Sequence, residues 1–172
     1  MKDLTEKNFG VIIAFLLPGF LFLWGLSCSF DEVATWLAKC RASEAPTVGG
    51  FLYATLASFS LGLLISAVRW LLVDHLLYYT GVGRKSLDFS NLKDKDRFAA
   101  FQGVVENHYR YYQYYSNTLI AILATFILYL VFGKVKPSVA IWIVAILIML
   151  ALFFGSRDAL NKYYTRANEI LK

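Results

Sequence analysis

The sequence predicts an all-α membrane protein in which four helices cross the bilayer. Hydrophobic residues make up 58% of its 172 residues, whereas a domain of about 150 residues buries only about 70% of the surface its chain exposes. The apolar residues also fall into four blocks, each near the roughly 20 residues that cross a bilayer core as a helix. No block shows the period-two alternation of a membrane β-barrel strand. Helices are therefore expected to satisfy the backbone polar groups within the lipid.

The four blocks define one predicted membrane domain over residues 1–172. Its spans are 9–28, 51–73, 117–132 and 138–155. The first block is longer than the apolar run of a usual signal peptide, and its leader carries as many acids as bases, so we expect it to be retained as a span. The third block is short for a span, since sixteen residues form a helix of only about 24 Å. We expect the helix to begin before that block.

Basic residues predict that both termini are cytoplasmic. The loop between the first two spans and the loop between the last two hold four Lys and Arg residues together, and the rest of the chain holds thirteen. Loops rich in Lys and Arg stay on the cytoplasmic side. The expected location is the inner (plasma) membrane of a bacterium, with an external loop, a cytoplasmic region and a cytoplasmic tail at 29–50, 76–116 and 156–172.

Helices are expected to extend from the membrane into the cytoplasm. The second helix continues through apolar residues and should end at Gly81 or Gly83, because glycine commonly terminates helices. A new helix is expected near Asp94 and should merge into the third span. The tail, 156–172, has apolar residues at helical spacing. It should form an amphipathic helix against the membrane or against the central cytoplasmic helix.

Pro18 and Gly19 lie in the middle of the first span. Proline removes a backbone hydrogen bond and clashes with the preceding turn, so a kink is expected there. The kink is either a tolerated bend or a hinge for gating.

Cys28 and Cys40 are the two cysteines of the chain, and both map to the outer side. A periplasm-facing loop permits a disulfide between them. Two unpaired thiols are the alternative.

Small residues recur at every fourth position of the second span. The stripe contains Ala54, Ser58, Gly62 and Ser66. This spacing lets another helix approach closely. The approaching helix belongs either to the same subunit or to a neighbouring one, and a pore wall dotted with hydroxyl groups is the third interpretation.

Arg69 interrupts the second span. A cation within the hydrocarbon costs about 3 kcal/mol unless it pairs or extends to the headgroups. Asp74 lies five residues further on, which makes an ion pair within the helix awkward. We therefore expect the side chain to reach the cytoplasmic headgroups, or to act as a charge at a pore mouth or ligand site.

Tyrosines are concentrated in the stretch ENHYRYYQYYSN at 106–117. Tyr111, Tyr112, Tyr114 and Tyr115 lie where aromatic rings mark the membrane interface. Other aromatic and basic residues on the cytoplasmic side suit a binding site for a nucleotide or a short nucleic acid, because bases stack on aromatic rings between cations. The predicted ligand-binding residues are Arg69, Tyr78, Tyr79, Arg84, Lys85, Tyr109, Arg110, Tyr163 and Tyr164.

The sequence shows no catalytic motif, and we expect no enzymatic activity. There is no phosphate-binding loop, no nucleophile elbow and no pair of carboxylates at a suggestive spacing. His75 and His108 lie on different predicted helices without metal-ligand spacing. No metal and no cofactor are therefore expected.

Two functions fit a four-helix chain with a basic, tyrosine-rich inner face. The first is a homo-oligomeric channel or pore that a ligand or partner opens or closes from the cytoplasm, with four copies as the expected number. The second is a non-conducting scaffold or sensor that recruits a soluble cytoplasmic, DNA-binding protein to the bilayer.

In topology and in the tyrosine- and arginine-rich segment, the chain resembles small membrane subunits of bacterial anti-phage systems such as Hailong and Kiwa. The Hailong resemblance implies a channel that a short DNA oligomer holds closed. The Kiwa resemblance implies a membrane sensor that works with a DNA-binding partner. No diagnostic motif is shared, so neither resemblance assigns a role to any residue.

Overall fold

The computed structural model describes residues 9–41, 48–82, 87–132 and 138–172, and the side chains of 38–41, 48, 49 and 91 are not described. In this part of the chain the regular elements are all helical. They are η1 (Ile12–Leu16), α2 (Leu17–Ser29), α3 (Asp31–Arg41), α4 (Val48–Tyr79), η2 (Phe89–Lys93), α5 (Lys95–Val104), η3 (Val105–Tyr109), α6 (Arg110–Phe132) and α7 (Val139–Leu171). η1 and η3 are π-helical turns, and η2 is a 3₁₀ helix.

Four helices are long and apolar enough to cross a membrane, one for each predicted span. They cover Phe9–Ser29, Gly50–Tyr79, Lys95–Phe132 and Val139–Leu171. The third runs without a break from α5 through η3 into α6, so the short third block is extended as predicted. The tail is the second half of α7 rather than a separate helix.

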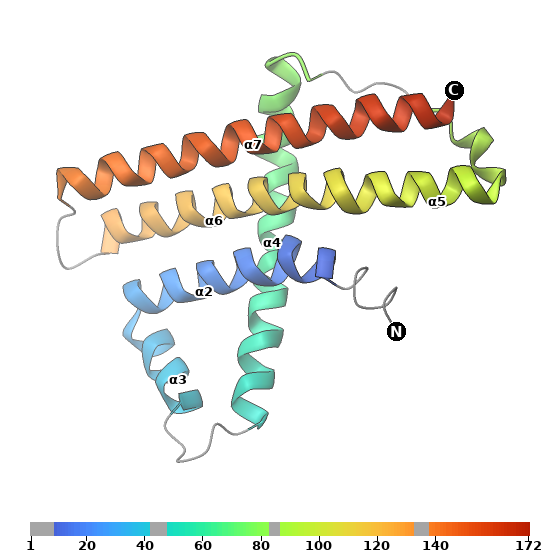
Figure 1. Cartoon of the computed structure of the whole chain (residues 1–172). Helices are drawn as coiled ribbons and strands as arrows, with labels where there is room; N and C mark the ends of the chain where they lie inside the picture. The colour runs from blue at the N-terminus through green and yellow to red at the C-terminus, as the bar shows by residue number, and fades with distance from the viewer. Residues whose placement is uncertain (1–8, 42–47, 83–86, 133–137) are drawn as a thin grey trace.

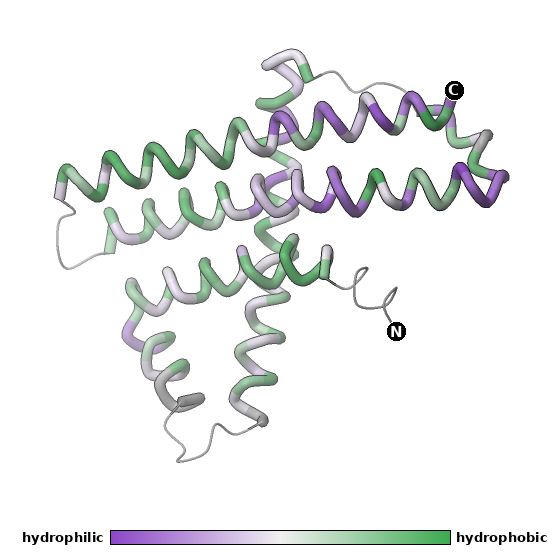
Figure 2. The backbone as a smooth tube through the Cα atoms, viewed as in Figure 1, coloured by the Kyte–Doolittle hydropathy of each residue, from purple (hydrophilic) through white to green (hydrophobic). Residues whose placement is uncertain are grey.

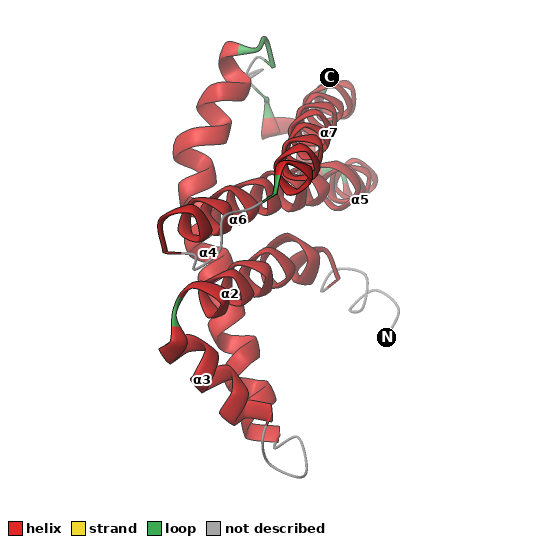
Figure 3. Ribbon diagram, turned by 90° about the vertical axis from the view of Figure 1, so that its left-hand side faces the viewer, coloured by secondary structure: helices red, strands yellow, loops and turns green. Residues whose placement is uncertain are grey.

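Three of the helices lie side by side and the fourth crosses them (Figure 1). α6 lies between α2 and α7, whereas α4 runs across α2 and α6, and its C-terminal end reaches α7 through Thr80 and Arg157. In the turned view α4 extends above and below the layer formed by α2 and α6 (Figure 3). α4 therefore does not share the direction in which the other three would cross a bilayer.

The layer of α2, α6 and α7 has an apolar end and a polar end (Figure 2). In the apolar part α6 and α7 meet through Phe126 and Trp142, whose ring centroids are 4.6 Å apart. In the polar part α5 and η3 pack against the second half of α7. The tail therefore packs on the central helix, one of its two predicted positions. α4 passes the layer close to the boundary between the two parts (Figure 2).

Local signals fix two of the helix ends. α4 ends at Tyr79; Gly81, two residues on, has a φ of 88°, and the N–H of Val82 donates to the Leu77 carbonyl at 3.2 Å. This is the glycine-terminated arrangement predicted for this end. α5 begins after Asp94, whose side chain accepts from the N–H of Asp96. Asp88 caps η2 in the same way, and the backbone N–H and the hydroxyl of Ser90 lower the pKa of its carboxyl.

The first helix approaches α4 very closely. A Cβ added at Gly19 would lie 1.8 Å from the Ser58 carbonyl oxygen, and one at Gly62 would lie 2.0 Å from the Phe15 carbonyl oxygen. Only a glycine on each helix permits this backbone contact. Two members of the small-residue stripe therefore pack against the first helix of the same chain. Ala54 and Ser66 of the stripe are half-buried.

Candidate functional site

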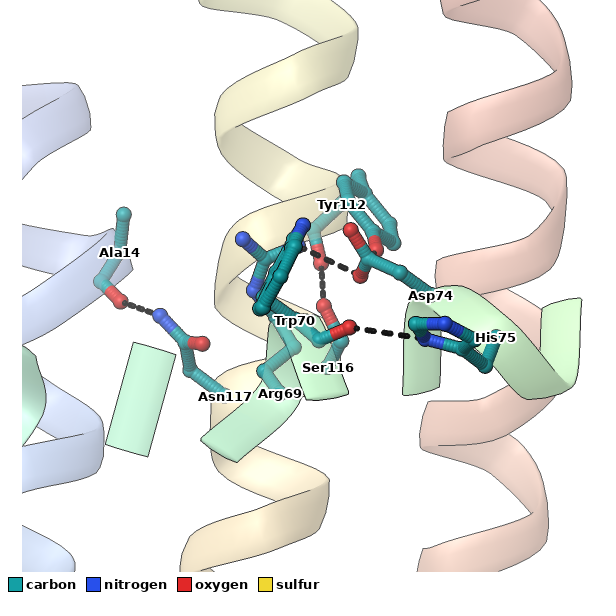
Figure 4. Close-up of polar contacts among 8 residues, drawn as sticks. All are labelled: Ala14, Arg69, Trp70, Asp74, His75, Tyr112, Ser116 and Asn117. Atoms are coloured by element: carbon teal, nitrogen blue, oxygen red, sulfur yellow. Dashed lines mark hydrogen bonds and ion pairs between the residues drawn. The ribbon is translucent and has the colours of Figure 1, made fainter. Parts of the chain in front are cut away.

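A cluster of polar side chains lies where α4 crosses α6, and we call it the polar junction (Figure 4). Its members are Arg69 and Asp74 of α4 and Tyr112, Ser116 and Asn117 of α6. Arg69, Tyr112, Ser116 and Asn117 are each at most 5% exposed. Polar groups inside a membrane protein are costly and usually have a role in its function, so this junction is the candidate functional site.

Arg69 is buried and forms an ion pair with Asp74. Its Nη1 donates to Asp74 Oδ1 at 3.0 Å, and its guanidinium carbon lies 5.0 Å from the centre of the Tyr112 ring. Arg69 was expected to reach the lipid headgroups, but the structure places its side chain inside the protein instead. The five-residue separation does not prevent the pair, because the long arginine side chain follows the helix surface while Tyr112 covers it from α6.

Tyr112 connects the two helices through the same carboxylate oxygen. Its hydroxyl donates to Asp74 Oδ1 across 38 residues of sequence, and its side chain is only 1% exposed. Tyr112 was expected at the membrane interface with its neighbours, and the structure places it in the core instead. A hydrogen bond to a charged group contributes about 1.5–3 kcal/mol, so this contact helps to hold α4 across α6.

Asn117 binds a main-chain oxygen that Pro18 leaves without its usual partner. In an α-helix the Ala14 carbonyl would accept from the N–H of residue 18, but proline has none. The Asn117 Nδ2 donates to this carbonyl at 2.7 Å. The helix also widens into the π-helical turn η1 just before Pro18, with the N–H of Leu17 bonded to the Ile12 carbonyl. The predicted distortion is thus present, and α6 stabilises it.

Two buried atoms of the junction have no hydrogen-bond partner within the described part of the chain. They are Arg69 Nε and Asn117 Oδ1. An unpaired buried polar atom costs about 1–3 kcal/mol. The buried hydroxyls of Thr118 and Thr125 on α6 also have no hydrogen-bond partner among the described residues. Thr125 faces Gly25 of α2. Three of these unpaired atoms therefore lie on α6 and one on α4.

The structure does not bring the predicted ligand-binding residues together. Arg69 belongs to the polar junction, while Tyr78 and Tyr79 lie at the end of α4 and are 57% and 81% exposed. Arg84 and Lys85 lie outside the described residues.

The other four predicted ligand-binding residues lie where η3 and the start of α6 meet α7. The Tyr109 and Tyr163 ring centroids are 5.0 Å apart, and those of Tyr163 and Tyr164 are 5.3 Å apart. All three rings pack against the hydrophobic core. Arg110 donates to Gln113 at 3.0 Å and lies 3.8 Å from Glu106. These side chains pack on one another instead of lining an open chamber in the single chain.

The remaining predicted positions give less information. Cys28 is exposed with a free thiol, but the side chain of Cys40 lies outside the described part, so their pairing stays a prediction. Among the described residues, no three His, Cys, Asp or Glu side chains come together as a metal site would require. His75 is exposed beside Trp70.

Most of the polar junction is absent from the predicted site residues. Only Arg69 was among them. Asn117 could have been found, because a proline in one span frees a carbonyl and an asparagine in another span can bind it. Comparison with protein-family models, with curated proteins and with solved structures gives no match.

Proposed function

We propose that this chain is the subunit of a homo-oligomeric membrane channel in which α4 is the moving element. The observation that carries the proposal is the contact between Asp74 of α4 and Tyr112 of α6, which joins a helix that lies across the layer to a helix within it. The most apolar parts of α4 and α7 are only 17% and 6% buried within the chain. A helix that is apolar on all sides is normally covered by protein or lipid. Neighbouring copies and lipid would provide that cover.

The polar junction supports a role for α4 in gating. It is the place where Tyr112 of α6 binds the ion pair of α4, next to buried polar atoms that have no partner among the described residues. Intramembrane ionisable groups commonly mark ion pathways. In the proposed closed state the junction is intact, and movement of α4 away from α6 opens a path along the unpaired polar atoms of α6.

The controlling signal would act at the polar end of the layer. The distribution of Lys and Arg favours a cytoplasmic position for this end, with both termini on the same side. A nucleotide or short nucleic acid remains the proposed ligand, and anti-phage defence the proposed setting, on the strength of the resemblance in topology. The residues for such a ligand would have to come together between subunits, because they are apart in one chain.

Flux measurements on the reconstituted full chain test this proposal. Liposomes with a trapped ion reporter would carry the parent protein, Tyr112→Phe or Tyr111→Phe. Tyr111→Phe is the matched control, since Tyr111 is on the same helix but 41% exposed. We expect flux in the parent, a several-fold increase with Tyr112→Phe and no change with Tyr111→Phe. Absence of flux in all three, with correct insertion verified, would exclude the channel.

A non-conducting scaffold is the second candidate, and one observation favours it. α5, η3 and the second half of α7 form a polar helical pair beyond the apolar layer (Figure 2), and this pair offers a firm surface to a soluble protein. Under this alternative the liposomes show no flux, and a soluble DNA-binding protein co-purifies with the parent. Charge reversal of the exposed Arg97 and Arg166 should then release that protein.

A further inference from the structure

A cleft of about 450 Å³ lies where the C-terminal end of α4 meets the middle of α7. The described residues that line it are Gly81, Val82, Phe154, Arg157, Asp158 and Asn161. The cleft shares no residue with the polar junction. It lies where α7 changes from hydrophobic to hydrophilic (Figure 2), which is the level expected for lipid headgroups.

The α4 side of the cleft is a fixed turn of backbone. The N–H of Gly81 donates to the Tyr78 carbonyl and the N–H of Val82 to the Leu77 carbonyl, both at 3.2 Å. The carbonyl of Thr80 accepts from Arg157 Nη2 at 3.1 Å. A guanidinium has five N–H groups, and one of those of Arg157 is thus used to position its side chain.

The α7 side of the cleft is a single helix face with an apolar end and a polar end. Its lining residues are Phe154, Arg157, Asp158 and Asn161. The last three follow Phe154 by three, four and seven positions, which places all of them on one face of the helix. Phe154 is 60% exposed at the apolar end. Asp158 accepts from Lys162 Nζ at 2.6 Å, so its negative charge is countered by the next turn of the helix.

We propose that this cleft binds an anionic phospholipid. Arg157 holds the phosphate, because a guanidinium matches phosphate oxygens with paired N–H donors, and Asn161 adds an amide donor one turn along. The Phe154 ring lies where the acyl chain leaves the headgroup. Basic pockets between membrane helices on the cytoplasmic side suit anionic lipids. Residues 156–172 carry four Lys and Arg against two acids, which favours a negative ligand.

Native mass spectrometry of the full chain in mild detergent tests this inference. The protein is titrated with a phosphatidylglycerol, and in a parallel series with a phosphatidylcholine of the same chain length. We expect preferential binding of phosphatidylglycerol, and about tenfold weaker binding in Arg157→Gln. Arg166→Gln removes the same charge from an exposed position of α7 outside the cleft, and should bind as the parent does.

Two further measurements keep the outcome clear. Asn161→Ala and Phe154→Ala change exposed positions and should each weaken phosphatidylglycerol binding several-fold, even if Arg157→Gln does not fold. Inorganic phosphate at millimolar concentration should not displace the lipid. Equal losses in Arg157→Gln and Arg166→Gln, equal binding of both lipids, or full displacement by phosphate would each overturn the assignment.

Discussion

The Asn117 amide donates to the carbonyl of Ala14 at 2.7 Å, and this is the carbonyl that Pro18 deprives of its α-helical partner. A sequence feature that weakens one span is thus matched by a polar side chain in another. The two residues should therefore be energetically coupled.

A double-mutant cycle tests this coupling. Asn117→Leu should lower the free energy of unfolding by about 1–3 kcal/mol, because the Ala14 carbonyl loses its donor. In a Pro18→Ala background the helix regains an N–H for that carbonyl, so the same change should cost clearly less. Unfolding of the detergent-solubilised protein, followed by circular dichroism, measures both values. Equal costs in the two backgrounds would contradict the coupling.

Tyr112→Phe should destabilise the protein by about 1–3 kcal/mol, because the change removes one hydrogen bond to the partly buried Asp74 carboxylate. The ring over Arg69 remains, so packing is unchanged. Tyr111→Phe serves as the control and should have almost no effect on the same unfolding curve. A stability of Tyr112→Phe equal to the parent's would show that the hydroxyl contributes nothing to holding α4.

Asp74→Ala should cost about 3–5 kcal/mol, since it leaves the buried Arg69 charge without its partner. The double variant Arg69→Met with Asp74→Ala removes the charge as well and should recover much of that stability. Chemical unfolding in detergent would compare the two. Should the double variant be as unstable as the sum of its single changes, the pair would be independent rather than coupled.

Gly62→Ala and Gly103→Ala should act in opposite directions. A methyl group at Gly62 would meet the Phe15 backbone oxygen, and crowding of this kind typically costs about 1–3 kcal/mol. At Gly103, within α5, no described atom lies within 4 Å of the added carbon. Alanine there should stabilise the helix by about 0.5–1 kcal/mol. Thermal unfolding of both variants checks the contrast, and a tolerated Gly62→Ala would argue against close contact of the first helix with α4.

The number of long apolar helices and two helix ends could be predicted from the sequence because they depend on local chemistry. Block lengths predicted four helices long enough to cross a membrane, Asp94 marked the start of α5 and Gly81 marked the turn that follows α4. The direction of α4 could not be predicted in this way. A helix that is apolar all round has no face that indicates which neighbour it meets, or at what inclination.

The candidate site was only partly predictable for a related reason. Arg69 is conspicuous as a cation in an apolar block, but its partner from α6 is distant in the sequence. Tyr112 stands among several similar tyrosines, and nothing local separates the buried ring from its more exposed neighbours. The predicted ligand set joined residues by type and by side of the membrane, whereas packing of Tyr109 on Tyr163 depends on how α7 folds back along α6.

The crosswise position of α4 has a consequence for how the chain is made. Asp74 is synthesised 38 residues before Tyr112, the side chain that fixes it. α2 is made before α4 and α6 after it, so the close contact of α4 with the first helix can form first. The contact between Asp74 and Tyr112 can form only after α6 has been made.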